Sequence, residues 1–429
     1  MIMKILLIHQ NFPGQFLHLA PALVRDGHEV HALVMKKEVP AEWNGVHMHS
    51  YMPTKGTAQG VHPWVLDMET KVIRAEAVFR KSLELKAAGF EPDVVIAHPG
   101  WGESLFIKDA WPQTRLGLYC EFNYNEHGQD VDFDPEFATH DPGDACRLRL
   151  KNLNNMMHFE LADGAVSPTH FQADTFPYPF RTKIKVLHDG IDTNKIAPYP
   201  LARLQVAPGK LLGRTDEVIT FANRNLEPYR GYHIFMRALP ALLKARPRAQ
   251  IVIVGGEGTS YGRRPPQGKT WKSVFLEEVR PQIDEQDWSR VHFLPNLPHD
   301  QFINFLQISR VHVYLTYPFV ASWSLLEAMS AGCAIVGSDT EPVQEFIKDG
   351  ENGLLTPFFE PQTLADQVVR LLEDAPLREK LGQAARRKVQ TYYDLEKVCL
   401  PRMVRWVDSL SPVRTPRLVH SRHSGQHAA

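Results

Sequence analysis

Short apolar runs alternate with amphipathic stretches along the whole chain. In the first half, Phe16, Leu19 and Leu23 are spaced for one face of a helix, and Gly27 stands where that helix should end. Pro21 should kink the helix or move its regular part downstream. Several of the apolar runs are almost uninterrupted, which is typical of parallel strands covered on both faces. The strands predicted here are 4–9, 29–34, 93–98, 115–119, 164–167 and 183–190.

The same alternation restarts in the second half, after a Pro-rich joint at 194–216. Alternating strands and helices imply right-handed crossovers and a parallel sheet. The sequence therefore predicts an α/β protein with two doubly wound domains that face a central cleft. We place the domains at 1–200 and 201–399, with a C-terminal helix at 400–415 packing back on the first domain and a disordered tail at 416–429. The second set of predicted strands is 217–224, 250–256, 290–295, 310–316, 333–339 and 352–357.

Composition excludes several classes of protein. The 429 residues carry a formal net charge of −1, which argues against a nucleic-acid-binding protein, because such a protein is expected to be basic. Cys120, Cys146, Cys333 and Cys399 are widely separated, so we expect reduced cysteines in a cytoplasmic protein. The N-terminus lacks a signal-peptide pattern, and no stretch reaches the roughly 18 to 20 apolar residues of a membrane span.

Open parallel sheets bind ligands beyond the carboxyl ends of their strands, so residues that directly follow strands are the candidates. Gly14, in NFPGQF, would let the backbone approach a ligand at a helix start, where N–H groups favour an anion. The stretch lacks G-x-G-x-x-G, so it is no dinucleotide fingerprint. His98 ends DVVIAH and could bond a substrate hydroxyl or phosphate, or accept a proton. A turn glycine and a structural histidine are the alternatives.

Two arginines follow the first strand of the second half. Arg224 ends that strand, and Arg230 comes six residues later, just before a glycine and a helix. Two cations at one strand end suit a pyrophosphate, because each can neutralise charge on a departing phosphate. Solvated surface arginines are the alternative.

The next strand exits offer weaker candidates. Gly256 lies in IVIVGGEG, a loop that allows close backbone approach, and Leu297 with Pro298 forms an apolar ledge for a flat base.

A short helix is predicted over 324–331. Free N–H groups at Ser324 and Leu325 could bind phosphate there. Glu327, one turn in, could accept hydrogen bonds from the two hydroxyls of a ribose. The alternative is an acid that the helix dipole favours in the first turn.

Three acids alternate in DVDFDPEF, residues 130–137, as ligands of a divalent cation could. The segment lacks the glycine and the distal Glu of a calcium-binding loop. We therefore predict a solvated polar loop and no metal site.

The segment LLEAMSAGCAIVGSDTEPVQEFIKDGENGLLTP (325–357) resembles the C-terminal signature of the retaining glycosyltransferases of family 4, which have the two-Rossmann GT-B fold. RNLEPYRG is similar to that family's Arg and Lys pair, with Arg230 in place of the usual Lys, and NFPGQF and HDGIDT match as well. The resemblance implies phosphate contacts from Gly14, Ser324 and Leu325, pyrophosphate contacts from Arg224 and Arg230, a ribose contact from Glu327, and His98 beside the transferred sugar.

The chain departs from this family at one position. Family members usually carry two Glu residues eight positions apart; the second matches Glu327, and the first falls on Phe319. That first carboxylate normally lies beside the donor sugar. The substitution therefore leaves the sugar's identity and the catalytic arrangement open.

The resemblance implies a retaining enzyme that moves a hexose-type sugar from a nucleotide-diphosphate donor to the hydroxyl of a carbohydrate or lipid-linked acceptor, in cell-envelope, exopolysaccharide or glycolipid biosynthesis. No cofactor or metal is expected, and 121–150 should form a loop over the first domain's cleft that shapes acceptor choice. A lipid acceptor would add peripheral contact at the inner face of the membrane. A nucleotide-sugar epimerase and a non-catalytic nucleotide-sugar binding protein are the open alternatives.

Overall fold

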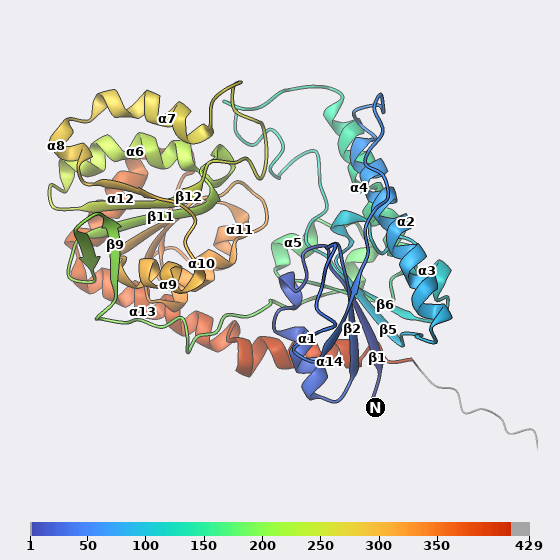
Figure 1. The fold of residues 1–429 in the computed structure, drawn as a ribbon. Helices are drawn as coiled ribbons and strands as arrows, with labels where there is room; N and C mark the ends of the chain where they lie inside the picture. The colour runs from blue at the N-terminus through green and yellow to red at the C-terminus, as the bar shows by residue number, and fades with distance from the viewer. Residues whose placement is uncertain (1, 413–429) are drawn as a thin grey trace, which may run out of the picture.

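The computed structural model describes residues 2–412 as two α/β domains, each built on a mostly parallel sheet (Figure 1). This confirms the predicted fold class. The predicted tail at 416–429, and the last residues of the helix predicted at 400–415, lie outside the described range.

The first domain contains an eight-stranded sheet in the order β3-β4-β2-β1-β5-β6-β7-β8. Neighbouring strands pair in parallel, for example Lys4 with Glu29, except for the antiparallel pair β3 and β4. Ile5 and Leu7 point to one core cluster and Leu6 and Ile8 to another, so both faces of the sheet are buried. The strands are β1 Lys4–Ile8, β2 Glu29–Val34, β3 Glu42–Trp43, β4 Val46–Ser50, β5 Val94–Ala97, β6 Arg115–Tyr119, β7 Gly164–Ser167 and β8 Ile184–Val186.

The helices of the first domain follow the predicted alternation. The first begins at Leu19, so Pro21 lies in its first turn, where a missing N–H costs no helical bond. The prediction of a loop over 121–150 is wrong at its end, because residues from Asp144 onward are helical. The helices are α1 Leu19–Arg25, α2 Leu66–Ala87, α3 Ile107–Ala110, α4 Asp144–Leu161 and α5 His170–Asp174, with short 3-10 turns at Gly14–Phe16, Pro99–Trp101 and Phe180–Lys183.

The second domain has a six-stranded parallel sheet in the order β13-β12-β11-β14-β15-β16. An antiparallel hairpin, β9 with β10, precedes it inside the stretch predicted as a joint; Leu204, Val206 and Leu212 of this hairpin pack into the second domain's core. The strands are β9 Arg203–Ala207, β10 Lys210–Gly213, β11 Val218–Asn225, β12 Gln250–Gly256, β13 Val291–Leu294, β14 Val311–Tyr314, β15 Ala334–Ser338 and β16 Leu354–Thr356.

Helices cover both faces of this second sheet as well. The long helical pattern after Pro361 is divided at Asp374, whose side chain accepts the N–H of Leu377 and so starts a new helix. The helices are α6 Tyr232–Ala245, α7 Trp271–Val279, α8 Glu285–Trp288, α9 His299–Ile308, α10 Trp323–Ser330, α11 Glu341–Gln344, α12 Pro361–Glu373 and α13 Ala375–Tyr392, with 3-10 turns at Pro228–Arg230 and Arg280–Gln282.

The chain crosses between the domains more than once. After α13, a short π-helix at Leu395–Cys399 leads into α14, Leu400–Asp408, which returns to the first domain (Figure 1). There Met403, Trp406 and Val407 pack into the first domain's core, as predicted for the C-terminal helix. Residues 121–143, which we call the crossing segment, leave the first domain after β6 and contact the second domain before α4 begins; Phe137, for example, packs its ring 5.2 Å from that of Trp271.

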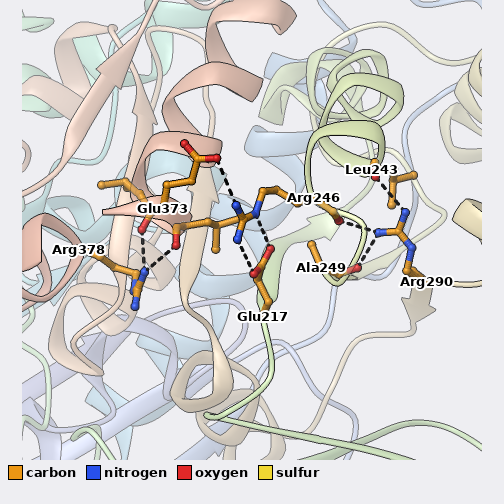
Figure 2. A network of polar contacts seen from close by, with 9 residues as sticks. Glu217, Leu243, Arg246, Ala249, Arg290, Glu373 and Arg378 are labelled. Atoms are coloured by element: carbon orange, nitrogen blue, oxygen red, sulfur yellow. Dashed lines mark hydrogen bonds and ion pairs between the residues drawn. The ribbon is translucent and has the colours of Figure 1, made fainter. Parts of the chain in front are cut away.

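Arginines link elements at the amino ends of β11 and β13 in the second domain, the end of the sheet opposite the cleft. Figure 2 shows their contacts. Arg246, at the end of α6, binds Glu217 at 2.8 Å and Glu373 at 3.2 Å. Arg290 donates to the carbonyl oxygens of Leu243, Arg246 and Ala249, which close the C-terminal end of α6. The Arg290 guanidinium thus satisfies the carbonyl of Leu243, which the helix leaves without an intrahelical partner, and binds the two carbonyls just beyond the helix end.

Among residues 2–412, no helix is both long enough and apolar enough to cross a membrane.

Candidate functional site

A cavity of about 330 Å³ lies between the two domains, at the carboxyl ends of both sheets. Its walls include Gly14, Glu121 and Asp189 from the first domain and Arg224, Glu227 and Arg230 from the second. Three of the residues predicted from sequence, Gly14, Arg224 and Arg230, therefore meet in one cavity although they are distant along the chain. We call this cavity the cleft.

Gly14 brings the backbone to the first domain's side of the cleft. Its φ is 45°, and a Cβ built on it would lie 2.2 Å from Cε1 of His9, so a larger residue would collide with a buried ring. The His9 ring is itself fixed, because Nε2 lies 2.5 Å from Oε1 of Gln15 and Nδ1 accepts the N–H of Asn11. Burial and the neighbouring His98 lower the pKa of His9 to about 4, so His9 is neutral near pH 7. The glycine is required by sterics at this turn.

His98 is buried just behind the cleft wall and points at Glu121. Its Nδ1 accepts the N–H of Gly100 at 3.1 Å, which leaves the proton on Nε2, 3.4 Å from Oε2 of Glu121. The His98 ring stacks on Trp101 with centroids 4.3 Å apart. Burial would by itself raise the pKa of the Glu121 carboxyl. The contact with His98 and the charge of Arg230 outweigh burial and hold this pKa below its usual value. Glu121 is therefore an anion in the cleft, with His98 in contact behind it.

Arg230 is held rigidly, with 8% of the residue exposed. Its guanidinium donates to Oγ1 of Thr316 at 2.8 Å and to the carbonyl of Val320 at 2.9 Å. Gly231, with φ of 69°, turns the chain into α6, and a Cβ there would lie 2.3 Å from Cβ of Leu315. Arg224 is exposed, and its side chain has no hydrogen-bond acceptor within the described part of the chain. The two arginines thus pair a fixed cation with one that is free to meet a ligand.

Glu227 fixes the loop that follows β12. It is 1% exposed, and its Oε2 accepts the N–H groups of Ser260 at 2.8 Å and Tyr261 at 3.3 Å. Burial raises the pKa of Glu227 despite these bonds. Gly256, at the end of β12, lies beneath this loop, where a Cβ would be 2.7 Å from Oδ1 of Asn225. Gly256 thus packs against the end of β11, and its contact with a ligand stays a prediction.

Helix α10 presents its first turn to the cleft through Ser322 and Trp323. The N–H of Ser324 donates to Oγ of Ser322 at 3.3 Å, and that of Leu325 donates to the carbonyl of Ser322 at 3.2 Å. These two groups were predicted to be free for phosphate, and both already have an acceptor in Ser322. A phosphate at this helix start would have to compete with that serine.

Glu327 and Leu297 lie near one another but do not line the cleft cavity. Oε1 of Glu327 lies 2.8 Å from Nε2 of His299, which is the first residue of α9 and only two residues after Leu297. This bond raises the pKa of His299. Leu297 is half-buried against the second domain's core. The contacts that we predict for Glu327 with a ribose and for Leu297 with a base stay predictions.

Phe319 occupies the position where the family resemblance places a carboxylate. It is 4% exposed and packs its ring 4.7 Å from that of Phe122, at the start of the crossing segment. Tyr229 and Tyr261 surround it at 5.2 and 5.0 Å, and Arg230 lies 5.8 Å from its centroid. The family's carboxylate is thus replaced by an aromatic contact between the domains.

Sequence reasoning missed two acids of the cleft. Glu121 follows the strand RLGLY by two residues, and Asp189 ends the run KIKVLHD, so both stand at strand exits. Oδ2 of Asp189 accepts the hydroxyl of Tyr119 at 2.8 Å and the indole N–H of Trp323 at 2.9 Å. Burial raises the pKa of Asp189 to about 7. The strand-exit rule that selected His98 would have selected both acids.

Asp134 and Glu136, two of the acids of 130–137, contact the second domain, and Asp134 is buried, so the predicted solvated loop is wrong there. Oδ2 of Asp134 lies 2.6 Å from the hydroxyl of Tyr317 and 3.0 Å from Nε2 of His233, while Glu136 binds Arg237 at 2.7 Å. Asp134, Glu136 and His233 are the one group of acids and histidines in residues 2–412 whose oxygen and nitrogen atoms lie within 4.8 Å of one another. Each of these residues already has a partner within the protein. The contacts of the acids therefore fix the crossing segment to the second domain.

Sequence comparison finds family matches over most of the chain. Residues 26–196 match the family described as "Glycosyl transferase family 4 group", and residues 207–388 match "Glycosyl transferases group 1". A phosphatidyl-myo-inositol mannosyltransferase of Mycobacterium leprae is 27% identical over 206 residues, 48% of either chain. A D-inositol 3-phosphate glycosyltransferase of Jonesia denitrificans is 29% identical over 263 residues, 58% of either chain. The matched region thus spans about half the length of these curated relatives.

Solved structures with the same fold cover nearly the whole chain. The sucrose-phosphate synthase of Thermosynechococcus elongatus aligns with a TM-score of 0.70 and 15% identity, covering 95% of this chain and 100% of that one. Anabaena HepE, solved with UDP and glucose, aligns with a TM-score of 0.64 and 16% identity over the same shares. At this identity the likeness establishes the fold.

Proposed function

Because the chain belongs to the family 4, group 1 glycosyltransferases, we propose that it is a retaining enzyme that moves a hexose-type sugar from a nucleoside-diphosphate donor to an acceptor hydroxyl. The observation that carries this proposal is the meeting of Arg224 and Arg230 with Gly14 in one cleft between the domains. Two cations and a close backbone approach are what a pyrophosphate flanked by two domains requires.

Departure of the nucleoside diphosphate is the step that the second domain supports. Arg230 is fixed by Thr316 and Val320 before any ligand binds, so it can stabilise developing phosphate charge without reorganising. Arg224 adds a second cation from the solvent side. With two guanidiniums available, we propose that no metal ion is needed to neutralise the leaving group.

Transfer with retention fits the groups that line the cleft. In a front-face reaction, the bond from the anomeric carbon to the phosphate oxygen breaks, and the bond to the acceptor oxygen forms on the same face. The acceptor's proton passes to the departing phosphate oxygen.

This route needs no carboxylate at position 319, where Phe319 is buried. Glu121, which lies beside His98, can accept hydrogen bonds from hydroxyls of the transferred sugar. Narrowing of the cleft on binding would exclude water from the reacting atoms.

The relatives suggest the class of substrates. Two relatives are named for transfer to phosphatidyl-myo-inositol and to D-inositol 3-phosphate, and the Anabaena neighbour was solved with UDP. We propose a nucleotide-sugar donor and a carbohydrate or lipid-linked acceptor of glycolipid or exopolysaccharide assembly, reached at the cytoplasmic face of a membrane by peripheral contact.

The proposal is tested in two steps. A thermal-shift screen of UDP, GDP, ADP and TDP should single out one nucleotide, because a ligand that binds only the folded state raises stability by RT ln(1 + [L]/Kd). The corresponding nucleotide sugars are then incubated with a panel of glycosides and lipid-linked sugars. The expected result is release of nucleoside diphosphate together with a glycoside that forms only when the acceptor is present. This glycoside should keep the anomeric configuration of the donor. Donor binding without released diphosphate on any acceptor would instead indicate a binding protein.

A nucleotide-sugar epimerase is a second candidate, because it needs carboxylates that face the sugar from the first domain. Glu121 and Asp189 both line the cleft from that domain. Incubation with the donor alone separates the two activities. An epimerised nucleotide sugar formed without an acceptor would replace the transferase assignment.

A further inference from the structure

A second and larger cavity, of about 630 Å³, lies between the crossing segment, α4 and the second domain. We propose that this cavity binds a saccharide ring of the acceptor, next to the ring that receives the transferred sugar. The inference rests on the proposed function, because it assigns a further subsite to the same reaction. The loop over 121–150 was expected to shape acceptor choice at the first domain's cleft, so a subsite shared with the second domain was not expected.

Aromatic rings form much of the cavity wall. They come from both domains, and those of Tyr229 and Tyr261 stack with centroids 5.5 Å apart. A pyranose has an apolar face of C–H groups and a polar rim of hydroxyls, and a pocket that combines aromatic surface with a few placed polar groups matches both. The rings that line the cavity are Tyr124, Phe137, Tyr229, Tyr261, Trp271 and Tyr317.

Two charged groups at this wall lack a full set of partners. Asp130 is 9% exposed; its Oδ2 accepts the Tyr229 hydroxyl, while its Oδ1 has no partner among the described residues. A buried carboxylate oxygen without a hydrogen bond is costly, so it marks a place where a donor is expected. Lys151, on α4, holds its Nζ 3.5 Å above the centroid of Tyr124, and no acceptor for it is found within residues 2–412.

A hydroxylated ligand satisfies both groups at once. A hydroxyl can donate to the Asp130 carboxylate and accept from the Lys151 ammonium, and sugar rings carry such hydroxyls on adjacent carbons. Burial lowers the pKa of Lys151 to about 8, so most of this amine is still protonated at pH 7 and remains a donor.

The cavity adjoins the cleft through one residue. Tyr261 lines both, and the guanidinium of Arg230 lies 5.4 Å from its ring centroid. A ring bound beside Tyr261 is therefore next to the proposed pyrophosphate site. An acceptor of at least two sugar units could place one unit here and present the other to the donor.

The crossing segment is fixed as a wall of this cavity. Asp134 binds Tyr317 at 2.6 Å and His233 at 3.0 Å, and Arg237 binds Glu136 at 2.7 Å. Because these bonds join the segment to α6 and to the loop after β14, the cavity exists before any ligand binds. Preformed walls reduce the ordering cost of binding.

The test measures the binding of four probes by saturation-transfer NMR on the full chain. The probes are maltose and the methyl α-glycosides of glucose, mannose and galactose. Ala138→Trp fills the cavity and Lys151→Met removes its ammonium. The matched controls are His127→Trp and Glu126→Gln, two exposed positions of the crossing segment that do not line the cavity. We expect at least one of the four probes to bind, Ala138→Trp to abolish binding, Lys151→Met to weaken it roughly tenfold, and both controls to bind like the wild type.

A parallel calorimetric titration with UDP, GDP, ADP and TDP keeps the two proposals separate. Retained nucleotide binding in Ala138→Trp shows that the variant is folded and that its cleft is intact. If none of the probes binds the wild type, or if Ala138→Trp and Lys151→Met bind them as well as the controls do, the subsite is overturned. If the wild type binds no nucleotide, the proposed function fails, whatever the glycosides do.

Discussion

Asp189 of the first domain accepts the indole N–H of Trp323 of the second domain, with 2.9 Å between Oδ2 and Nε1. Trp323 is the first residue of α10, so this bond ties the start of that helix to the strand exit where Asp189 lies. The same carboxylate oxygen accepts the hydroxyl of Tyr119. One partly buried acid therefore links the two walls of the cleft, and its charge state bears on how they are held together.

Replacement of Asp189 by Asn should change the pH dependence of stability. Burial raises the pKa of Asp189 to about 7, above the value of about 3.9 for an unfolded Asp. Between these two values the folded state holds a proton that the unfolded state has lost, so the Asp189 contribution to the free energy of unfolding falls as the pH rises from about 4 to 7. Asp189→Asn does not titrate and keeps both hydrogen bonds.

The measurement is the melting temperature of both proteins between pH 5 and 8. The Asn variant should gain stability relative to the wild type as the pH rises. Asp339→Asn, at an exposed position, is the control and should follow the wild type. A difference between Asp189→Asn and wild type that does not vary with pH would contradict the assigned pKa.

Truncation of Phe319 should destabilise the fold. Phe319→Ala removes a buried ring that packs against Phe122, Tyr229 and Tyr261, and such a change typically costs about 3 to 5 kcal/mol of unfolding free energy. Phe319→Leu keeps more of the volume and should lose less. Urea unfolding followed by fluorescence measures both. Tyr178→Ala, at a residue that is 80% exposed, should change stability by no more than about 0.5 kcal/mol. A loss from Phe319→Ala as small as this control's would show that the aromatic contact is unimportant.

Removal of the Arg290 guanidinium should weaken the second domain without touching the cleft. Arg290→Met leaves the carbonyls of Leu243, Arg246 and Ala249 without their charged donor (Figure 2). We expect a loss of about 2 to 4 kcal/mol, because buried acceptors are left unsatisfied. Chemical unfolding measures it, with the exposed Arg264→Met as control. Equal stability of the two variants would refute the role of this network.

Glu345 caps a helix that belongs to the other domain. Its carboxylate accepts the N–H groups of His170 at 2.8 Å and Phe171 at 3.0 Å, at the start of α5. Glu345→Ala should cost about 1 kcal/mol, as the loss of a helix cap usually does. Thermal unfolding measures this loss, and Glu351→Ala, which removes only a surface ion pair with Lys348, should have a smaller effect. If both variants have the same melting temperature, the contact does not stabilise the domain arrangement.

Elements whose apolar pattern is local were predicted well. The runs that became β1, β2, β11 and β12 are apolar on both faces, and the structure buries them on both faces. The strand β4 was missed because it lies near a sheet edge and carries His47 and His49, which make the run VHMHS polar. The hairpin β9–β10 was missed because prolines flank it and suggested a linker.

The sequence predicted candidate residues near the ends of individual strands, but not how these residues contact one another. Gly14 and Arg230 follow a strand, Arg224 stands near the end of one, and the structure brings all three together in the cleft. The pairing of His98 with Glu121, and of Asp189 with Trp323, depends on contacts between segments that are distant in sequence, and no local pattern specifies them. The contact between Phe319 and Phe122 is of the same kind, because the sequence shows that a carboxylate is missing but not what its replacement touches.

The central claim is that Arg224 and Arg230 bind the pyrophosphate of the donor. The most direct test is calorimetric titration of the double variant Arg224→Gln/Arg230→Gln with the nucleoside diphosphate that the screen selects. Arg230→Lys, which restores the family's usual residue, and the exposed Arg264→Gln serve as controls, and circular dichroism checks that each variant is folded. Since hydrogen bonds to charged groups contribute about 1.5 to 3 kcal/mol each, the double variant should bind at least roughly 100-fold more weakly, while both controls stay within about tenfold of wild type. A folded double variant that binds the diphosphate and turns over donor as the wild type does would contradict the account.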